Sequence, residues 1–140
     1  MFPFNVRVYG ILIHAGRVLL CRESHRGREL VKFPGGGLEF GEGPVDAVVR
    51  EFREELELPV KVTEHLYTTH FFQRSAFDPR HQIISIYYLI RFRDEVPEWA
   101  ERGSYEWDGR VFIWHDTRDL SADDLTLPID KYVVPLIPGR

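Results

Sequence analysis

The sequence has 140 residues, of which 44% are hydrophobic and 29% are charged, values typical of one globular domain. Its net charge of -4 argues against duplex DNA or RNA as the main partner, because proteins that bind these polymers usually carry a basic surplus. The single cysteine, Cys21, excludes an internal disulfide, and its apolar surroundings favour a buried structural residue over a nucleophile.

The N-terminal segment predicts a β-hairpin. Residues 6–14 read VRVYGILIH and are rich in β-branched and aromatic residues, which favour a strand. Ala15-Gly16 is a turn signal, and residues 17–22 resume the strand pattern. Residues 23–30 are polar and charged, so we expect a loop there.

A glycine-rich segment and a helix follow. Residues 33–37 read FPGGG and cannot be helical. Residues 44–56 have a helical pattern, with Pro44 suited to the first turn and Pro59 ending the element. Residues 60–72 predict a strand.

The C-terminal half continues with strands and weaker helical signals. The segment 82–92, QIISIYYLIRF, is the strongest predicted strand in the sequence. Strands combined with one strong helix and a weaker late one suggest a mixed sheet packed between helices, an α/β fold of one domain over residues 1–140. The remaining elements are expected to be a loop at 73–80, an acidic loop at 94–108, a strand at 110–114, a helical turn at 117–124 and a short helix within 128–137.

The predicted helix 44–56 carries three glutamates on one flank. At about 100° per residue, Glu51, Glu54 and Glu55 share a sector beside the apolar stripe. Clustered carboxylates repel one another unless a cation neutralises them, and hard oxygen ligands suit Mg²⁺ or Mn²⁺. The alternative is a solvated acidic face paired with arginines of the same helix. The residues expected in the apolar stripe are Val45, Val48, Val49, Phe52 and Leu56.

The segment Gly36–Leu58, GGLEFGEGPVDAVVREFREELEL, favours the metal interpretation. It resembles the Nudix box, G-x(5)-E-x(7)-R-E-U-x-E-E-x-G-U, where U is a bulky apolar residue. Eight of the nine specified positions match at the correct spacing. The box glycine is replaced by Glu57, where a left-handed helix cap would cost about 1 kcal/mol for a residue with a side chain. We interpret this as a capping change outside the metal-binding face.

The resemblance implies an α/β/α sandwich with a mixed sheet, in which the box forms a loop-helix-loop. It further implies a Nudix pyrophosphatase, which hydrolyses the diphosphate linkage of a nucleoside diphosphate linked to another group with Mg²⁺ or Mn²⁺. Candidate substrates are nucleoside triphosphates, nucleotide sugars and ADP-ribose-like compounds. The alternatives are a non-catalytic nucleotide sensor of the same fold and an interaction domain whose acidic helix binds a basic partner.

The resemblance also suggests roles for individual residues. Glu51, Glu54 and Glu55 would bind metal, and the carbonyl oxygen of Gly36 would add a ligand. Glu51 or a glutamate from a later loop would be the general base. Two further box residues and one later acid have expected roles: Arg50 would hold the glutamates by ion pairing, Glu42 would bind metal through water or brace the loop, and Glu106 is a candidate additional ligand or base.

Basic and aromatic residues around the box are candidates for substrate binding. The cations before the glycine loop could contact substrate phosphates, although a solvated basic loop is an equal alternative. The aromatic residues could stack on a base, but most aromatics at strand spacing lie in the core. The cations are Arg22, Arg26, Arg28 and Lys32, and the aromatics are Phe33, Phe71, Phe72, Tyr87 and Tyr88.

The expected setting is a cytoplasmic protein with a small nucleotide-like substrate. The N-terminus MFPFNVRVYG lacks the basic start and long apolar stretch of a signal peptide, and no apolar run reaches the roughly 20 residues of a membrane span. No membrane or nucleic acid polymer is therefore expected as partner. By analogy, a homodimer is possible, to which segment 82–90 or the N-terminal hairpin could contribute.

Overall fold

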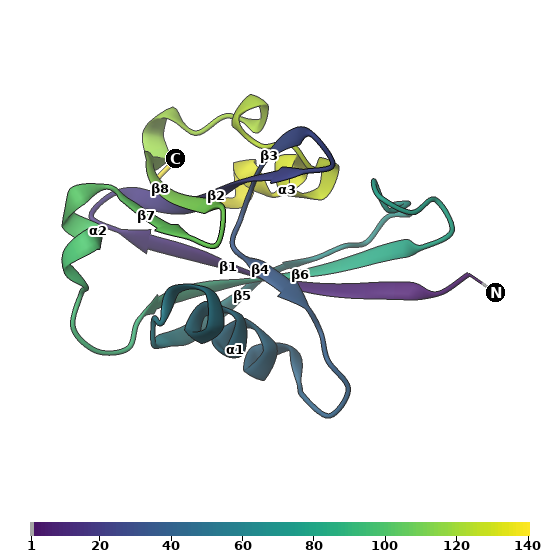
Figure 1. Cartoon of the computed structure of the whole chain (residues 1–140), viewed down its shortest axis with the longest axis horizontal. Coiled ribbons are helices and arrows are strands. Elements are labelled where there is room, and N and C mark those ends of the chain that lie inside the picture. Colours follow the sequence, from purple (N-terminus) through teal and green to yellow (C-terminus); the bar gives the residue numbers. More distant parts are fainter. Residues whose placement is uncertain (1) are drawn as a thin grey trace.

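The computed structural model describes residues 2–140 and contains a mixed β-sheet with helices on both faces (Figure 1). Short 3-10 turns at Thr117–Asp119, Ala122–Asp124 and Val134–Leu136 complete the C-terminal part. The strands are β1 (Phe4–His14), β2 (Arg17–His25), β3 (Arg28–Lys32), β4 (Gly35–Gly37), β5 (Val60–Thr68), β6 (Gln82–Phe92), β7 (Ser104–Trp107) and β8 (Arg110–Asp116). The helices are α1 (Pro44–Leu56), α2 (Glu98–Arg102) and α3 (Pro128–Val133).

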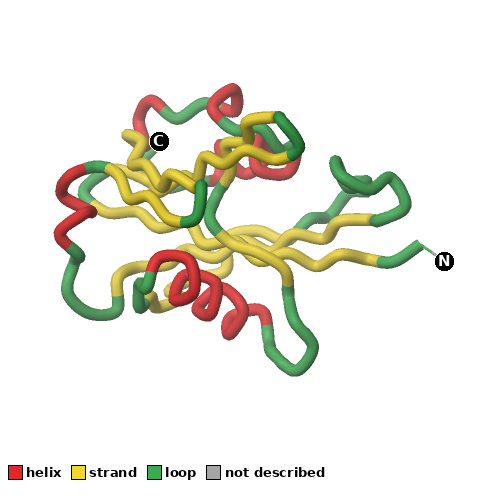
Figure 2. Tube along the Cα trace, viewed as in Figure 1, coloured by secondary structure: helices red, strands yellow, loops and turns green. Residues whose placement is uncertain are grey.

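The sheet is organised around β1. Its strand order is β5-β6-β1-β2-β8-β7, with β3 added on β2 and β4 added on β1. The pair β1–β6 is parallel, whereas the other strand pairs in the described chain are antiparallel. In Figures 1 and 2, α1 lies on one side of this sheet and α3 on the other. The mixed sheet between helices confirms the α/β/α architecture expected from the sequence.

Alternation along β1 divides the core between the two faces. Val8 and Leu12 belong to the cluster that contains Phe52 of α1, whereas Tyr9 and Ile11 belong to the cluster that contains Ile129 of α3. Successive strand residues point to opposite faces, so a strand buried on both sides reads as a nearly continuous apolar run. This pattern explains why the segment 6–14 lacks the apolar-polar alternation of a strand with one solvated face.

Glycine at position 10 allows α1 to approach the sheet closely. A Cβ at Gly10 would lie 2.6 Å from Cε1 of Phe52 and 2.7 Å from Cδ1 of Ile90. The space that a side chain would need is therefore already filled by the Phe52 ring. The close packing fixes the depth of α1 against β1 and, with it, the position of the glutamates on the flank of α1.

Two predicted elements have the expected bounds, and several others differ. Helix 44–56 and strand 82–92 are confirmed at both ends. The loop expected at 23–30 is wrong, because β2 continues to His25 and pairs with β3 through a tight turn. Arg26 and Gly27 have φ values of 51° and 76° in that turn, a geometry that two-residue hairpin turns require. The acidic segment 94–108 contains α2 and β7 and is not a plain loop.

One expectation about packing also needs correction. Val45 is 44% exposed, and Ala47, which has no exposed surface, takes its place on the buried face of α1. Strand β6 lies between β1 and β5, so both of its edges are already paired and cannot add a strand from a second copy. Among the helices of residues 2–140, none is long and apolar enough to cross a membrane.

Candidate active site

The box helix α1 is defined at both ends by backbone geometry. Gly43 is the N-cap, and its N–H donates to the Asp46 carboxylate at 3.2 Å, while Pro44 starts the first turn. At the other end, Glu57 adopts the left-handed conformation with φ 51° and ψ 35°. Its N–H donates to the carbonyl of Arg53, and Leu58 donates back to Phe52. The helix thus ends as it would with glycine, although the residue carries a side chain.

Arg50 connects the box loop to the box helix. Nε and Nη2 of Arg50 donate to the two oxygens of Glu42 at 2.9 and 2.8 Å, and Nη2 also donates to the carbonyl of Gly37 at 3.0 Å. Nη1 donates to Glu51 at 3.1 Å and to Glu54 at 3.2 Å. The planar guanidinium uses its fork geometry fully, which a lysine could not do. One cation therefore positions three acids of the box.

The Glu42 carboxylate is held as an anion in this network. Hydrogen bonds from Arg50, and one from the backbone N–H of Glu39 at 2.9 Å, lower the pKa of Glu42 to about 2. Both oxygens of Glu42 accept from Arg50. Glu42 thus contacts the loop at Glu39 and, through Arg50, the helix, which agrees with a bracing role for this acid.

Gly36 and Glu51 are in direct contact. A Cβ at Gly36 would lie 2.4 Å from the carboxylate carbon of Glu51, so only glycine leaves room for that side chain. The Glu51 side chain is only 13% exposed. Strand β4 places Gly36 opposite Val8 of β1, which fixes the backbone against which this carboxylate rests. The glycine-rich segment therefore shapes the floor of the site.

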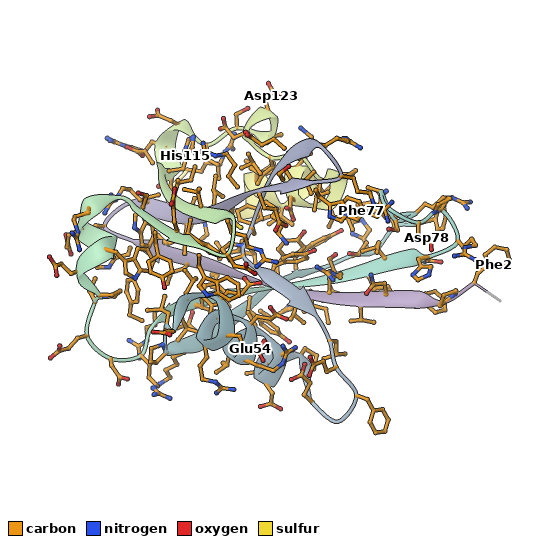
Figure 3. The ribbon with its side chains drawn as sticks, viewed as in Figure 1. Phe2, Glu54, Phe77, Asp78, His115 and Asp123 are labelled. Carbon is orange, nitrogen blue, oxygen red and sulfur yellow. The ribbon has the colours of Figure 1, made fainter. Side chains whose placement is uncertain are left out.

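Glu54 and Glu55 differ in their environments. The side chain of Glu54 is 56% exposed on α1, where Figure 3 labels it. Glu55 is half-buried, and burial raises the pKa of its carboxyl to about 7, with nearby Glu51 adding to the rise and Arg110 opposing it. No described cation lies within ion-pair distance of the Glu55 carboxylate. Glu55 is the box acid whose charge is least compensated by protein groups.

The acids present are suited to a hard divalent cation. Carboxylate and carbonyl oxygens are the ligands that Mg²⁺ and Mn²⁺ prefer, and a box acid without a cationic partner is stabilised by such an ion. Within residues 2–140, no three His, Cys, Asp or Glu side chains are already gathered around one metal-sized space. Of the three predicted metal ligands, Glu51 and Glu54 are instead paired with Arg50, and Glu55 is not. To bind a metal, the carboxylates of Glu51 and Glu54 would have to contact the ion alongside Arg50 or give up their hydrogen bonds to Arg50.

A cleft of about 290 Å³ lies beside the box. The charged end of the cleft consists of Arg7, Glu23, Lys32 and Arg110. Glu23 accepts from Lys32 at 3.0 Å and from Arg110 at 2.8 Å. Burial raises the pKa of Glu23, but the two cations outweigh it, and the net shift is downward. The apolar end contains Tyr9, Leu30, Phe77 and Leu127.

A buried acid lies behind the apolar end of this cleft. Asp130 of α3 is 1% exposed and accepts a hydrogen bond from the Tyr87 hydroxyl at 2.5 Å and one from the Phe33 N–H at 3.4 Å. Burial raises the pKa of Asp130 to about 6. Tyr9 stacks on Tyr87 with ring centroids 5.1 Å apart. Tyr87 and Asp130 line a second hollow, which shares Tyr9, Phe77 and Leu127 with the cleft.

The structure brings together only part of the predicted substrate-binding set. Lys32 lines the cleft, where it is buried and paired with Glu23. Arg26 and Arg28 lie at the β2–β3 turn and line a hollow that shares His25, Leu30 and Phe77 with the cleft, whereas Arg22 is exposed on β2. Glu106 is exposed on β7, opposite Val111 of β8. It makes no ion pair or hydrogen bond with the described box residues.

Two of the five candidate stacking aromatics, Phe33 and Tyr87, are buried core residues, and Phe71 and Tyr88 are partly buried against the core. Phe33 and Tyr87 have no exposed surface, whereas Phe72 is 63% exposed. The aromatic residues that border the cleft are Tyr9 and Phe77, which the sequence did not single out. Phe77 lies near the end of β2, where it meets His25 with ring centroids 4.5 Å apart (Figure 3).

Sequence reasoning also missed the charged groups of the cleft. Arg7, Glu23 and Arg110 come from three strands, and Glu23 and Arg110 are 87 positions apart in the sequence. A signal existed for Arg7, because it shares a face of β1 with Tyr9 and Ile11 in an otherwise apolar strand. No comparable local signal marks Glu23 or Arg110.

Comparison with known proteins decides the family. The model of the family described as NUDIX domain matches residues 1–137. The chain belongs to the Nudix family. It is also 31% identical over 102 residues to the 8-oxo-dGTP diphosphatase of Escherichia coli K12, which covers 73% of this chain and 69% of that protein. Membership makes this chain a hydrolase of the type that acts on phosphoric anhydride bonds.

Solved Nudix structures share the fold at low sequence identity. A MutT Nudix hydrolase from Burkholderia pseudomallei superposes with a TM-score of 0.74 at 19% identity, covering 96% of this chain and 98% of that one. An ADP-ribose pyrophosphatase from Streptococcus suis superposes with a TM-score of 0.64 at 17% identity, covering 96% and 87%. The 8-oxo-dGTP diphosphatase and the ADP-ribose pyrophosphatase have different named substrates, so the shared fold alone does not identify the substrate. The family generally uses divalent metals.

Proposed function

We propose that this chain hydrolyses a diphosphate linkage in a nucleoside diphosphate linked to a further group, with Mg²⁺ or Mn²⁺ bound by Glu51, Glu54 and Glu55. The observation that carries the proposal is the convergence of box acids on Arg50, against the glycine-rich segment and next to a cationic cleft. A solvated acidic helix face would not need a largely covered arginine, 14% exposed, to order its acids. An interaction domain that binds through this face would not need a cleft beside it.

The protein residues have separate tasks in this proposal. Glu51, Glu54 and Glu55 provide oxygen ligands, with the carbonyl of Gly36 as a further candidate, and Arg50 keeps the carboxylates in place. A bound divalent ion would supply charge neutralisation and acidify the attacking water. Glu51 or a later acid such as Glu106 would accept the proton of that water. The departing phosphate would leave through the open side of the cleft.

The shape of the cleft suggests how the substrate lies. Tyr9, Phe77 and Leu127 form an apolar end suited to the flat face of a nucleobase. The cationic residues are the ones near the box acids, because Arg110 and Lys32 act electrostatically on Glu55, and Arg7 on Glu51. The nucleoside would therefore occupy the apolar end, with its phosphates directed toward α1. The relative named 8-oxo-dGTP diphosphatase supports including oxidised purine triphosphates among the candidates.

The decisive experiment is a hydrolysis screen with Mg²⁺ and with Mn²⁺. The panel contains nucleoside triphosphates including 8-oxo-dGTP, nucleotide sugars, ADP-ribose and dinucleoside polyphosphates, and the readout is release of phosphate or pyrophosphate. Metal-dependent turnover supports the enzyme. Binding of a nucleotide without turnover in either metal would instead support the sensor.

Variants of α1 test the metal ligands. Glu54→Gln and Glu55→Gln are expected to lower kcat by about a hundredfold or more, because each removes a charge that the transition state needs. Glu57→Gln on the same helix is the matched control and should keep full activity. Unchanged turnover in the Glu54 and Glu55 variants, with melting temperatures near wild type, would remove the assignment.

The homodimer stays a prediction. Because β6 is paired on both edges, segment 82–90 could contribute to a dimer through a face of the sheet but not by strand addition, and the N-terminal hairpin is the other candidate surface. Light scattering of the purified protein measures the mass directly. A mass near the 16.5 kDa of one chain would contradict the dimer.

A further inference from the structure

Arg7 is a half-buried cation without a carboxylate partner. It lies on β1, two residues from Tyr9, and the two side chains share the face of the sheet that leads to α3. Its one hydrogen bond within the described chain is a long one, from Nε to the Tyr9 hydroxyl at 3.5 Å. No Asp or Glu of residues 2–140 lies within ion-pair distance of its guanidinium. Most of the five donors of Arg7 therefore remain free to bind an anion.

The position of Arg7 links the cleft to the Nudix box. A Cβ at Gly37 would lie 3.5 Å from Nη1 of Arg7, while the carbonyl of Gly37 accepts from Arg50 at 3.0 Å. The backbone of Gly37 is thus close to both arginines. Arg7 also lines the cleft that holds Lys32 and Arg110. An anion bound by Arg7 would lie next to the box without competing for Arg50, which is already occupied by acids.

The cleft walls carry more positive than negative charge. Arg7, Lys32 and Arg110 are cationic, and Glu23 is the carboxylate among the lining residues, which leaves a surplus of two positive charges when His25 is neutral. Glu23 accepts from Lys32 and Arg110 but is not within ion-pair distance of Arg7. Burial disfavours the charge of Arg7, but the interaction with Tyr9 and the carboxylates of Glu51 and Glu23 at longer range outweigh burial, so the pKa of Arg7 is raised. The surplus points to an anionic ligand at the Arg7 side of the cleft.

We propose that Arg7, together with Lys32, binds a phosphoryl group of the substrate on the nucleoside side of the scissile linkage. The identity of the anion rests on the proposed function. A substrate whose base lies at Tyr9 and whose scissile linkage lies at α1 has its first phosphoryl group between these two positions. A planar guanidinium can contact two phosphoryl oxygens at once. Arg7 is a binding residue in this scheme, and it determines affinity for the charged part of the nucleotide.

Binding of inorganic pyrophosphate without metal tests the anion site separately from catalysis. Calorimetry in EDTA at low salt should detect pyrophosphate binding to the wild-type protein, and Arg7→Met should weaken it about tenfold through the loss of charge-assisted hydrogen bonds. Arg7→Lys should retain part of the affinity, because the charge remains without the planar fork. Arg91→Met is the matched control, since Arg91 is exposed on β6 and does not line the cleft.

Kinetics give a second readout on the active substrate. Arg7→Met should raise KM about tenfold and change kcat by less than about threefold, the pattern expected for binding shared by ground state and transition state. Melting temperatures verify folding, and Arg7→Gln replaces Arg7→Met if the latter does not fold.

The outcomes separate this inference from the proposed function. Equal pyrophosphate affinity in wild type and Arg7→Met, or no binding by a wild-type protein that hydrolyses nucleotides, overturns the role of Arg7. Arg7-dependent pyrophosphate binding in a protein that hydrolyses no member of the panel keeps the anion site and overturns the enzyme.

Discussion

Arg50 donates two parallel hydrogen bonds to Glu42, from Nε to Oε2 at 2.9 Å and from Nη2 to Oε1 at 2.8 Å. This pairing joins the loop before α1 to the middle of the helix. The remaining nitrogen, Nη1, contacts the carboxylates of the adjacent residue Glu51 and of Glu54 one turn further along. The geometry of the proposed metal-binding face therefore depends on one planar cation.

Replacing Arg50 with lysine should impair the enzyme more than the fold. Lysine keeps the charge but cannot bond Glu42 through two nitrogens while also reaching Glu51 and Glu54. We expect kcat to fall by about 10–100-fold, as for other groups that orient metal ligands. Steady-state kinetics and metal titration measure the effect. Arg53→Lys on the exposed side of α1 should leave both unchanged, and equal loss in the two variants would contradict a specific role for Arg50.

Replacing Glu57 with glycine should stabilise the protein. Glu57 has φ 51° and ψ 35°, a conformation that costs a side-chain-bearing residue about 1–2 kcal/mol relative to its preferred regions. Glycine removes this strain but increases the entropy of the unfolded chain, so a net gain of roughly 0.5–1 kcal/mol is expected. Urea unfolding measures the gain as a higher midpoint.

Glu57→Ala distinguishes backbone strain from the loss of the glutamate charge. Alanine keeps a Cβ, so it retains the strain while removing the carboxylate. A stability gain in Glu57→Ala as large as that in Glu57→Gly would mean that charge, and not backbone conformation, limits stability at this helix end.

The buried acid Asp130 should make stability depend on pH. Burial raises its pKa from 3.8 to about 6. The hydrogen bonds from Tyr87 and from the Phe33 N–H partly oppose this rise, and so do the more distant cations Lys32 and Arg7. The folded state therefore binds the proton more tightly than the unfolded state. The corresponding stabilisation is fully present below pH 3.8 and is lost as pH rises through about 6.

Asp130→Asn removes this titration while keeping an acceptor for Tyr87. As pH rises from about 4 to about 7, the unfolding free energy of the wild type should fall relative to that of Asp130→Asn by on the order of 3 kcal/mol. Urea unfolding over this range is the measurement. Parallel curves for the two proteins would show that Asp130 has an ordinary pKa in the folded state.

Local sequence patterns predicted the elements that carry the box. The helix 44–56 is specified by Pro44 at its start, an apolar stripe along one side and Pro59 after its end. The strand 82–92 is specified by a long run of β-branched and aromatic residues. In both cases the information lies within the element itself, and the predicted bounds agree with the structure.

The incorrect expectations involve contacts outside the segment concerned. The charged residues between Glu23 and Leu30 suggested a loop, but backbone pairing of β2 with β3 satisfies their N–H and C=O groups and forms a hairpin. Val45 fits the apolar sector of a helical wheel, yet it belongs to neither core cluster, and it is 44% exposed. A wheel gives the direction of a side chain but not the extent of the surface that covers it.

The sequence by itself determined the box: its acids, Arg50, their spacing on one helix and hence the family and its chemistry. These features depend on distances along the chain of a few residues, which helical geometry converts directly into neighbouring positions. Tertiary structure alone decided the cleft, where Arg7, Glu23, Lys32 and Arg110 meet from four strands. Their meeting depends on strand order and register across the sheet, because pairing between distant segments sets which side chains become neighbours.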